Sequence, residues 1–225
     1  MKILVYSLIL IMLSSCIEII DDLSMNNDGS GTAKYTINLS SSKIKANSYL
    51  ALDSLNGKKV PSIQEIENKI EEYKKKLENK EGISGVVVET NFTDFIFKFQ
   101  CDFENVQALQ KAIKEIAASE NKDWVDEEYV WLSWKEDELS RSTPTPSPTI
   151  IESLKRDDVE LLKNGSYISI TRFERPIEKV SNPNAKISAN RMAVMTRTNP
   201  YLLTQNTEIL KNTIYLSQIK KQVKN

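Results

Sequence analysis

Two alternating segments on either side of one turn signal constrain the fold of this chain most strongly. Residues 26–31 read Asn-Asn-Asp-Gly-Ser-Gly, and such residues favour tight turns. Apolar residues share one face of the extended segments that flank this turn: Ile17, Ile19, Leu23 and Met25 before it, and Ala33, Tyr35, Ile37 and Leu39 after it. The pattern predicts an antiparallel β-hairpin whose first strand begins at residue 17.

Helical spacing follows the hairpin. Ser62 and Glu65 form a capping box, which marks the start of a helix. The apolar residues after it recur at helical intervals, namely Ile63, Ile66, Ile70, Tyr73 and Leu77. We therefore expect an amphipathic helix of about 17 residues here. Residues 106–116 carry a second helical pattern, and a weaker helix is predicted over residues 42–55.

A row of phenylalanines marks a strand in the middle of the chain. Residues 86–88 form a short apolar run, and Phe95, Phe97 and Phe99 then lie on one face of the next extended segment. Cys101 continues this row, so we predict a buried, inert thiol rather than a redox or nucleophilic group.

An aromatic segment at residues 129–134 has large apolar groups on both faces, which predicts a strand. Tyr129 and Trp131 share one face, and Val130, Leu132 and Trp134 share the other. Two readings follow: a central strand packed in the core, or a strand with one face along a groove. Tyr129 and Trp131 are therefore the candidate residues for ligand contact, because aromatic rings offer large contact area.

The second half of the chain leaves one alternative open. Residues 147–163 are either a helix that Asn164-Gly165 ends, or the first part of a hairpin that Asn164-Gly165 turns. Residues 166–173 are a strand in both cases. Residues 175–183 are expected to be a loop, and residues 212–216 a last strand.

Hairpins rather than single strands alternate with helices in this order of elements. We therefore predict an α+β fold: an antiparallel or mixed sheet built from hairpins, with two or three helices packed on one face. A doubly wound parallel sheet does not fit the pattern. Residues 142–149 read Ser-Thr-Pro-Thr-Pro-Ser-Pro-Thr, which predicts an exposed Pro-rich connection within a single domain.

Composition removes several classes of function. The chain contains no His, which excludes Ser-His-Asp and Cys-His catalysis and the commonest metal ligand. No cofactor or metal site is expected, since the turn at residues 26–31 lacks the spaced acids of a calcium loop. The net charge of −1 gives no argument for nucleic-acid binding.

Charge is unevenly distributed. Residues 16–150 hold 16 basic and 24 acidic groups, whereas residues 151–225 hold 13 basic and 7 acidic groups. Either the two parts pack together and neutralise each other, or the basic part faces anionic lipid headgroups.

The first sixteen residues indicate export. Met1-Lys2 precedes an apolar run from Ile3 to Leu13, which is too short to span a membrane but typical of a secretory signal. Leu13-Ser14-Ser15-Cys16 follows it. We predict a signal peptide at residues 1–15 and a single exported α+β domain at residues 16–225.

The Leu-Ser-Ser-Cys motif resembles the lipobox of bacterial lipoproteins. The resemblance implies lipidation of the Cys16 thiol and cleavage before it, which leaves Cys101 without a partner for an intramolecular disulfide. The sequence from Cys16 through the Asp-Gly-Ser-Gly turn resembles uncharacterised lipoproteins of the Bacteroidota, and loosely the LppM-type domain. That resemblance implies an exported α+β domain, and LppM-like domains are associated with binding amphiphilic lipids.

The resemblance also implies a location and one modification. Ile17 stands where an Asp would signal retention at the inner membrane, so the outer membrane facing the periplasm is expected, with surface exposure as the alternative. Asp53-Ser54-Leu55 resembles the O-glycosylation acceptor of Bacteroidota, which makes Ser54 a candidate glycosylation site.

These observations predict a non-catalytic binding or assembly module of the cell envelope. The expected partners are the membrane, through the lipid anchor, and either a lipid or other amphiphile or an envelope protein. The alternatives are a carboxylate-dependent envelope hydrolase and a structural lipoprotein without a ligand. Because the strand pattern begins one residue after Cys16, the first sheet edge should lie within roughly 10 Å of the headgroups. The basic 151–225 part should share that side.

We expect Cys16→Ala to release the protein into the soluble fraction or to leave it as an uncleaved precursor. Stable membrane attachment takes at least two acyl chains, and this variant offers no thiol at the predicted cleavage site. Fractionation and the mass of the N-terminal peptide measure the effect, with Cys101→Ala as the control. Normal cleavage with undiminished membrane attachment would contradict the lipoprotein assignment.

Overall fold

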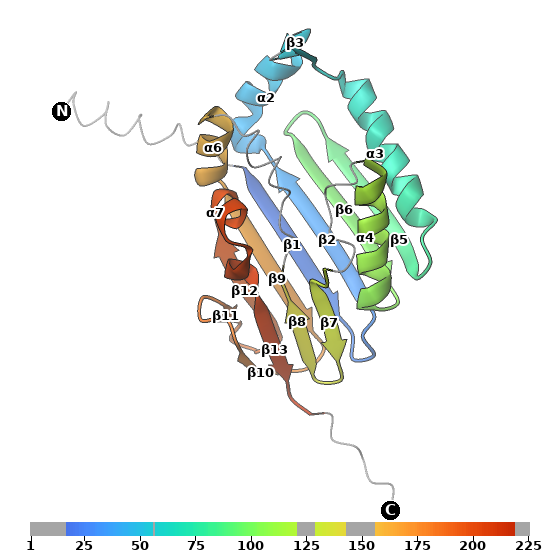
Figure 1. Ribbon diagram of the computed structural model, residues 1–225, viewed down its shortest axis with the longest axis vertical. Helices are drawn as coiled ribbons and strands as arrows, with labels where there is room; N and C mark the ends of the chain where they lie inside the picture. The colour runs from blue at the N-terminus through green and yellow to red at the C-terminus, as the bar shows by residue number, and fades with distance from the viewer. Residues whose placement is uncertain (1–16, 56, 121–128, 143–155, 219–225) are drawn as a thin grey trace, which may run out of the picture.

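The computed structural model describes residues 17–55, 57–120, 129–142 and 156–218 (Figure 1). The predicted signal peptide, Cys16 and residues 143–149 of the Pro-rich connection lie outside these ranges. Within them, no helix is long and apolar enough to cross a membrane.

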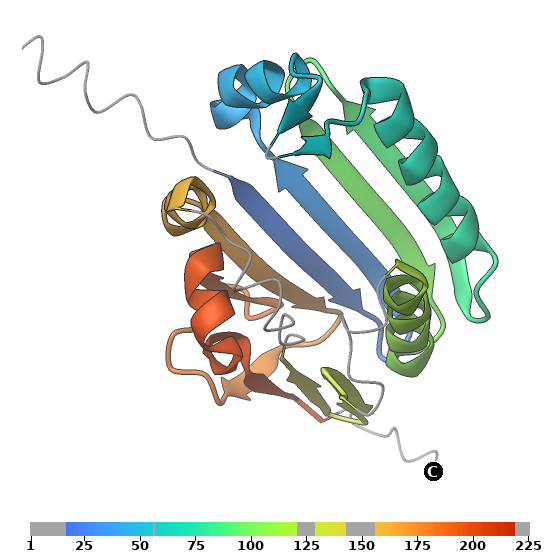
Figure 2. The ribbon, with the colours of Figure 1, turned by 45° about the horizontal axis from the view of Figure 1, so that its top comes forward.

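Two β-sheets form the protein. The larger is mixed and has seven strands in the order β11-β12-β9-β1-β2-β6-β5, and the smaller is antiparallel with the order β10-β13-β8-β7. The small sheet and the helices lie on the same face of the large sheet (Figures 1 and 2). We call this the inner face and the opposite one the outer face. The α+β class, the mixed sheet built from hairpins and the helices on one face are confirmed; the second sheet was not predicted.

The strands of the large sheet are β1 (Glu18–Met25), β2 (Gly31–Asn38), β5 (Ile83–Asn91), β6 (Ile96–Phe103), β9 (Ser166–Phe173), β11 (Lys186–Ile187) and β12 (Ala193–Thr198). Those of the small sheet are β7 (Leu132–Lys135), β8 (Glu138–Arg141), β10 (Ile177–Val180) and β13 (Asn212–Leu216). The helices are α2 (Lys43–Leu50), α3 (Ile63–Glu78), α4 (Val106–Glu120), α6 (Arg156–Lys163) and α7 (Pro200–Gln205). Short elements complete the chain: β3 (Ser54–Leu55), β4 (Lys58–Lys59), η2 (Ser40–Ser42) and η3 (Thr207–Leu210).

The predicted first hairpin is confirmed. Strands β1 and β2 pair in antiparallel register from Glu18–Asn38 to Met25–Gly31. In the turn, the Asp28 carboxylate accepts hydrogen bonds from the backbone N–H and the hydroxyl of Ser30. Gly29 has a positive φ of 89°, which glycine adopts without strain.

The first strand lies inside the sheet and is not an edge. Strand β1 pairs with β2 on one side and runs parallel to β9 on the other, with Glu18 opposite Ser166 and Met25 opposite Phe173. The expectation of a sheet edge near residue 17 is therefore wrong, because a strand from the far end of the chain covers it.

The helix predictions hold with shifted boundaries. At α3, the hydroxyl of Ser62 accepts from the Glu65 N–H, and the Glu65 carboxylate accepts from the Ser62 N–H. Helix α2 stops at Leu50, because residues 54–55 form the β3 strand instead of the last helical turn. Helix α6 settles the alternative at residues 147–163 in favour of a helix over its described part, and it ends at Asn164-Gly165 as predicted.

One strand boundary differs from expectation, and several strands were not predicted. Strand β7 begins at Leu132, not Tyr129, and pairs with β8, which was not predicted. Strand β10 occupies part of the expected loop at residues 175–183, because it pairs with β13. Strand β12 was also missed, although it covers the other side of β9.

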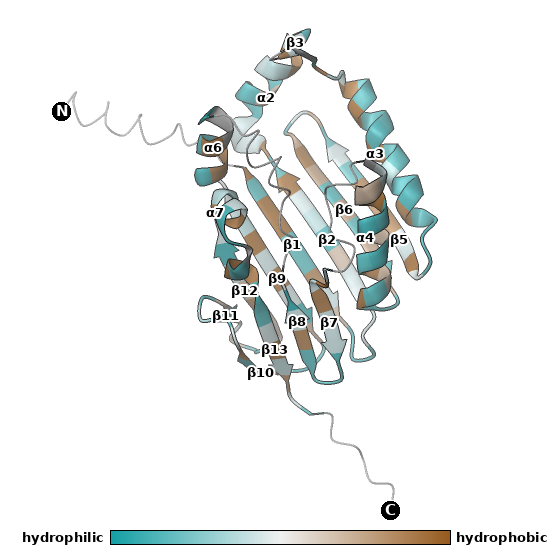
Figure 3. Cartoon of the chain, in the orientation of Figure 1, coloured by the Kyte–Doolittle hydropathy of each residue, from teal (hydrophilic) through white to brown (hydrophobic). Residues whose placement is uncertain are grey.

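The core lies between the two sheets and under α4. Its most deeply buried side chains include Met25, Val106, Leu139, Ile177 and Ile214. Figure 3 shows hydrophobic (brown) and hydrophilic (teal) residues alternating along the strands, while the side of α3 that faces the viewer is mostly hydrophilic. Cys101 is 5% exposed, and burial raises the pKa of its thiol to about 11, so the predicted buried thiol is confirmed.

Ion pairs join the acidic and basic parts of the chain, as the first of the two charge explanations predicts. The Arg172 guanidinium donates to both oxygens of the Asp22 carboxylate, at 3.0 and 3.1 Å from Nε. Arg175 is buried and donates to the Asp137 carboxylate and to the backbone carbonyl of Glu136.

One buried side chain holds the backbone in place where β7, the first strand of the small sheet, begins. The Gln110 Oε1 atom accepts hydrogen bonds from the N–H groups of Trp131 and Leu132, at 2.9 and 3.0 Å, and its Nε2 donates to the Leu132 carbonyl at 2.8 Å. Gln110 thus acts toward the start of β7 as a neighbouring strand would.

We expect Gln110→Ala to lower the free energy of unfolding by about 2–4 kcal/mol, because it leaves buried backbone groups unpaired. Chemical denaturation measures this. Gln107→Ala, an exposed glutamine on the same helix, is the control and should change stability by under about 0.5 kcal/mol. Equal stability of both variants would contradict the role of Gln110.

Candidate functional site

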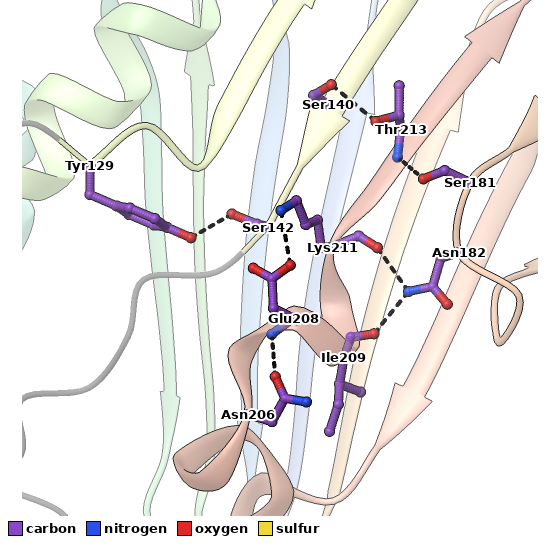
Figure 4. A network of polar contacts seen from close by, with 10 residues as sticks. All are labelled: Tyr129, Ser140, Ser142, Ser181, Asn182, Asn206, Glu208, Ile209, Lys211 and Thr213. Carbon is purple, nitrogen blue, oxygen red and sulfur yellow. Dashed lines mark hydrogen bonds and ion pairs between the residues drawn. The ribbon is translucent and has the colours of Figure 1, made fainter.

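The two aromatic residues predicted to contact a ligand serve the interior of the protein. Trp131 is 7% exposed and belongs to the core, with the Lys114 ammonium 5.7 Å from its ring centroid. The Tyr129 hydroxyl lies 2.7 Å from the Ser142 hydroxyl and points toward it (Figure 4). Both residues pack against the core, as the core-packing interpretation of residues 129–134 predicted.

The surroundings of Tyr129 form a structural network. Lys211 and Glu208 pair at 2.9 Å, and this carboxylate raises the pKa of the lysine (Figure 4). Asn182 donates to the carbonyls of Ile209 and Lys211, which fixes the chain before β13. These contacts fix the chain around the start of β13.

A cleft of about 470 Å³ lies beside Trp131, but neither aromatic ring lines it. Its walls are the 62% exposed Val130 and the polar side of α4, with Lys111, Lys114 and Glu115. Residues 121–128, which connect these two walls, lie outside the described ranges. We therefore place the candidate site elsewhere.

The end of the large sheet where β1 begins gathers elements from across the chain, and we call it the anchor end. Strand β9 also begins here, since the Ser166 N–H donates to the Ile17 carbonyl at 2.7 Å. Strands β2 and β12 end here. Gly165 permits this close approach, because a Cβ at that position would lie 2.5 Å from Ile17.

A polar pocket of about 190 Å³ opens at the anchor end. Its lining combines one cation, one carboxylate and several hydroxyl and amide groups: Ile17, Glu18, Asn38, Ser41, Asn164, Gly165, Ser166 and Arg197. The Arg197 Nε donates to the Ser166 hydroxyl at 2.9 Å, which orients the guanidinium. Among the described residues, neither Arg197 nor Glu18 takes part in an ion pair, so both charges are available to a ligand.

An apolar strip continues from this pocket along the outer face. The sheet register places Ile20 beside Ile168, and Arg197 on the other side of Ile168. The next row places Ile170 beside Met195. These side chains are half-buried, and within the part of the chain that the structure describes no helix or second sheet packs on them. We call Ile20, Ile168, Ile170 and Met195 the outer strip.

Strand β9 carries large apolar side chains on both sides, since Ile168 and Ile170 lie on the outer face while Tyr167 and Phe173 are buried on the inner one. Its inward side carries Tyr167, Ser169, Thr171 and Phe173. The polar residues are tolerated there because Arg141, which is itself buried, donates to Thr171 Oγ1 and to the Ile170 carbonyl at 2.8 Å. The outward Ile168 and Ile170 lie outside both clusters of buried core residues.

The same buried arginine joins the two sheets. Arg141 of β8 forms an ion pair with Asp21 of β1, and the Tyr167 hydroxyl donates to this carboxylate at 3.0 Å. Burial raises the pKa of Tyr167 well above its usual value, and the Asp21 charge adds to the shift. The phenol is therefore neutral at physiological pH and acts as a hydrogen-bond donor.

The other predicted site residues are placed as follows. Ser54 lies in β3 and is exposed, so its hydroxyl is accessible to modification. Cys16 lies outside the described ranges. Sequence reasoning missed Arg197 and the outer strip; the available signal was the alternation of Ile168 and Ile170 with polar residues, which favours the opposite orientation of this strand.

Comparisons with known proteins add little to this geometry. No protein-family model matches the chain, and no curated protein matches it in sequence. Among solved structures, the chain is similar to the NMR structure of the folded domain of Mycobacterium tuberculosis LppM, at 6% identity and a TM-score of 0.41 over 91% of each chain. A likeness at this level carries no argument about function.

We expect Trp131→Ala to lower the free energy of unfolding by about 3–5 kcal/mol, because it empties a large buried volume. Val130→Ala is the matched control. Val130 is the exposed neighbour of Trp131, so this substitution should change the free energy of unfolding by under about 0.5 kcal/mol. Thermal or chemical denaturation measures both. A stable Trp131→Ala protein that has lost a ligand would show instead that the ring serves binding.

Proposed function

We propose that this protein is a lipid-anchored, non-catalytic binding module of the bacterial cell envelope. Its ligand is an amphiphile whose polar head enters the anchor-end pocket and whose apolar part lies on the outer strip. The observation that carries the proposal is the continuity of the pocket with the strip, directly after the predicted lipid-bearing Cys16.

The size and charge of the pocket suit a headgroup. Pockets that enclose whole small molecules measure roughly 300–1,000 Å³, and this one is smaller. Arg197 suits a phosphate or carboxylate, since guanidinium groups bind such anions with paired hydrogen bonds. Glu18 suits a hydroxyl or ammonium donor on the same headgroup.

The lining of the pocket supports binding over the hydrolase alternative. A carboxylate-dependent glycosidase uses two acids on either side of the scissile bond. Among the residues that line the pocket, Glu18 is the one carboxylate. The outer strip also gives binding an advantage over a purely structural role, because the isoleucines of β9 face solvent instead of the core.

Native mass spectrometry tests the proposal. The protein is purified from its own envelope in mild detergent, and we expect a retained amphiphile. Arg197→Gln should lower its occupancy roughly tenfold or more, because a hydrogen bond to a charged group contributes about 1.5–3 kcal/mol. Arg172→Gln, which removes another arginine of the outer face, is the control and should retain the ligand.

Two results would contradict the proposal. One is a wild-type protein that carries no amphiphile, and the other is equal retention by Arg197→Gln and the wild type. A retained envelope protein in place of an amphiphile would favour the assembly role.

A further inference from the structure

A lobe at the tip of the anchor end exposes large apolar side chains. It comprises α2, β3 and β4, within residues 43–60, and we call it the tip lobe (Figure 1). Ile44 is 81% exposed, Leu52 44% and Leu55 37%, and α2 has no buried residue. Folding of the protein alone does not explain leucine and isoleucine in these positions, since they contribute little to the core.

Several contacts fix the tip lobe at the anchor end of the large sheet. Ser41, two residues before α2, lines the same pocket as Ile17. Lys43 pairs with Asp94 at 3.3 Å, and the Leu39 N–H donates to the Phe95 carbonyl at 2.9 Å. The lobe therefore lies at the end of the sheet from which the chain continues toward Cys16.

Basic residues outnumber acidic ones in the tip lobe. Residues 43–60 contain four lysines and one aspartate. Lys43 and Lys59 pair on the surface with Asp94 and Glu65, and exposed ion pairs of this kind are weak. Lys45 lies 5.6 Å from the ring centroid of Tyr49, so cationic and apolar groups are interspersed. A lysine keeps its ammonium group in water while its stem lies along apolar surface, so lysines beside exposed apolar side chains are compatible with contact to a headgroup layer.

Some basic residues of the 151–225 part lie at the anchor end, and others lie at the opposite end of the sheet. Arg197 lies in the anchor-end pocket, and α6 brings Lys163 close to Tyr201. Arg175 follows β9 at the opposite end of the sheet, because β9 runs away from Ile17. Only some basic residues of the 151–225 part lie at the anchor end. The lysines of the tip lobe add to them there.

We propose that the tip lobe docks into the headgroup layer of the bilayer that holds the lipid anchor. Ile44, Leu52 and Leu55 enter the interface, and the lysines contact anionic phosphates. This contact gives the domain one fixed orientation, with the anchor-end pocket at the level of the headgroups. The inference rests on the lipid anchor of the proposed function and does not depend on amphiphile binding.

A depth measurement on the full lipidated protein tests the docking. The protein is placed in vesicles of phosphatidylethanolamine and phosphatidylglycerol that contain a nitroxide lipid, and a fluorophore is attached after Leu52→Cys substitution. Labelling is selective, because Cys101 is buried and Cys16 carries the lipid in this preparation. Asn27→Cys, in the exposed β1–β2 turn at the opposite end, is the control.

We expect quenching at position 52 to be at least about threefold stronger than at position 27, since docked interfacial segments lie within reach of the headgroup nitroxides. Adding Ile44→Asp and Leu55→Asp should reduce the quenching to the level of the control. Val130→Asp, at a 62% exposed apolar residue away from the lobe, should leave it unchanged.

Three results would overturn the inference. The first is equal quenching at positions 52 and 27. The second is association of the labelled lobes with one another in place of lipid contact, which would indicate a second copy of this chain. The third is a glycan on Ser54 in protein from the native host, because a glycan there would keep the lobe out of the interface. Failure of amphiphile binding in Arg197→Gln would leave the quenching at position 52 intact, so the two proposals fail separately.

Discussion

The parallel contact between β1 and β9 holds the two parts of this protein together. It joins residues about 146 positions apart, as the hydrogen bond between Tyr167 and Asp21 shows. The contact places the start of β9 against Ile17, and thereby builds the anchor-end pocket from both parts of the chain. It also brings Thr171 beneath β8, where Arg141 bonds it and joins the small sheet to the large one.

Local patterns in the sequence predicted the local structure well. The turn at residues 26–31, the capping box at Ser62 and the row of phenylalanines that ends at Cys101 each fix an element through neighbouring residues, and these predictions are confirmed. Strands β10 and β12 were missed because each depends on a partner distant in sequence, β13 and β9 respectively. Strand β8 was missed because it is short, although it pairs with the adjacent β7.

The candidate site was hidden for a related reason. Alternation shows that a strand has two different faces, but it does not show which face meets the core. In β9 both faces carry large apolar residues: Tyr167 and Phe173 are buried, and Ile168 and Ile170 lie on the outer face. The sequence predicted ligand contact for Tyr129 and Trp131 because their rings are large. In the structure, Gln110 and Ser142 bond this segment to the interior.

The position of β1 between β2 and β9 also determines how the domain would resist a pulling force. A pull on the chain before Ile17 acts along the axis of β1, which is bonded over its whole length to β2 and β9. Ladder hydrogen bonds run across the strands, so such a pull loads both ladders in shear and all of their bonds resist together. An edge strand pulled from the side would open one bond at a time. The arrangement therefore resists unfolding by tension applied to the chain before Ile17.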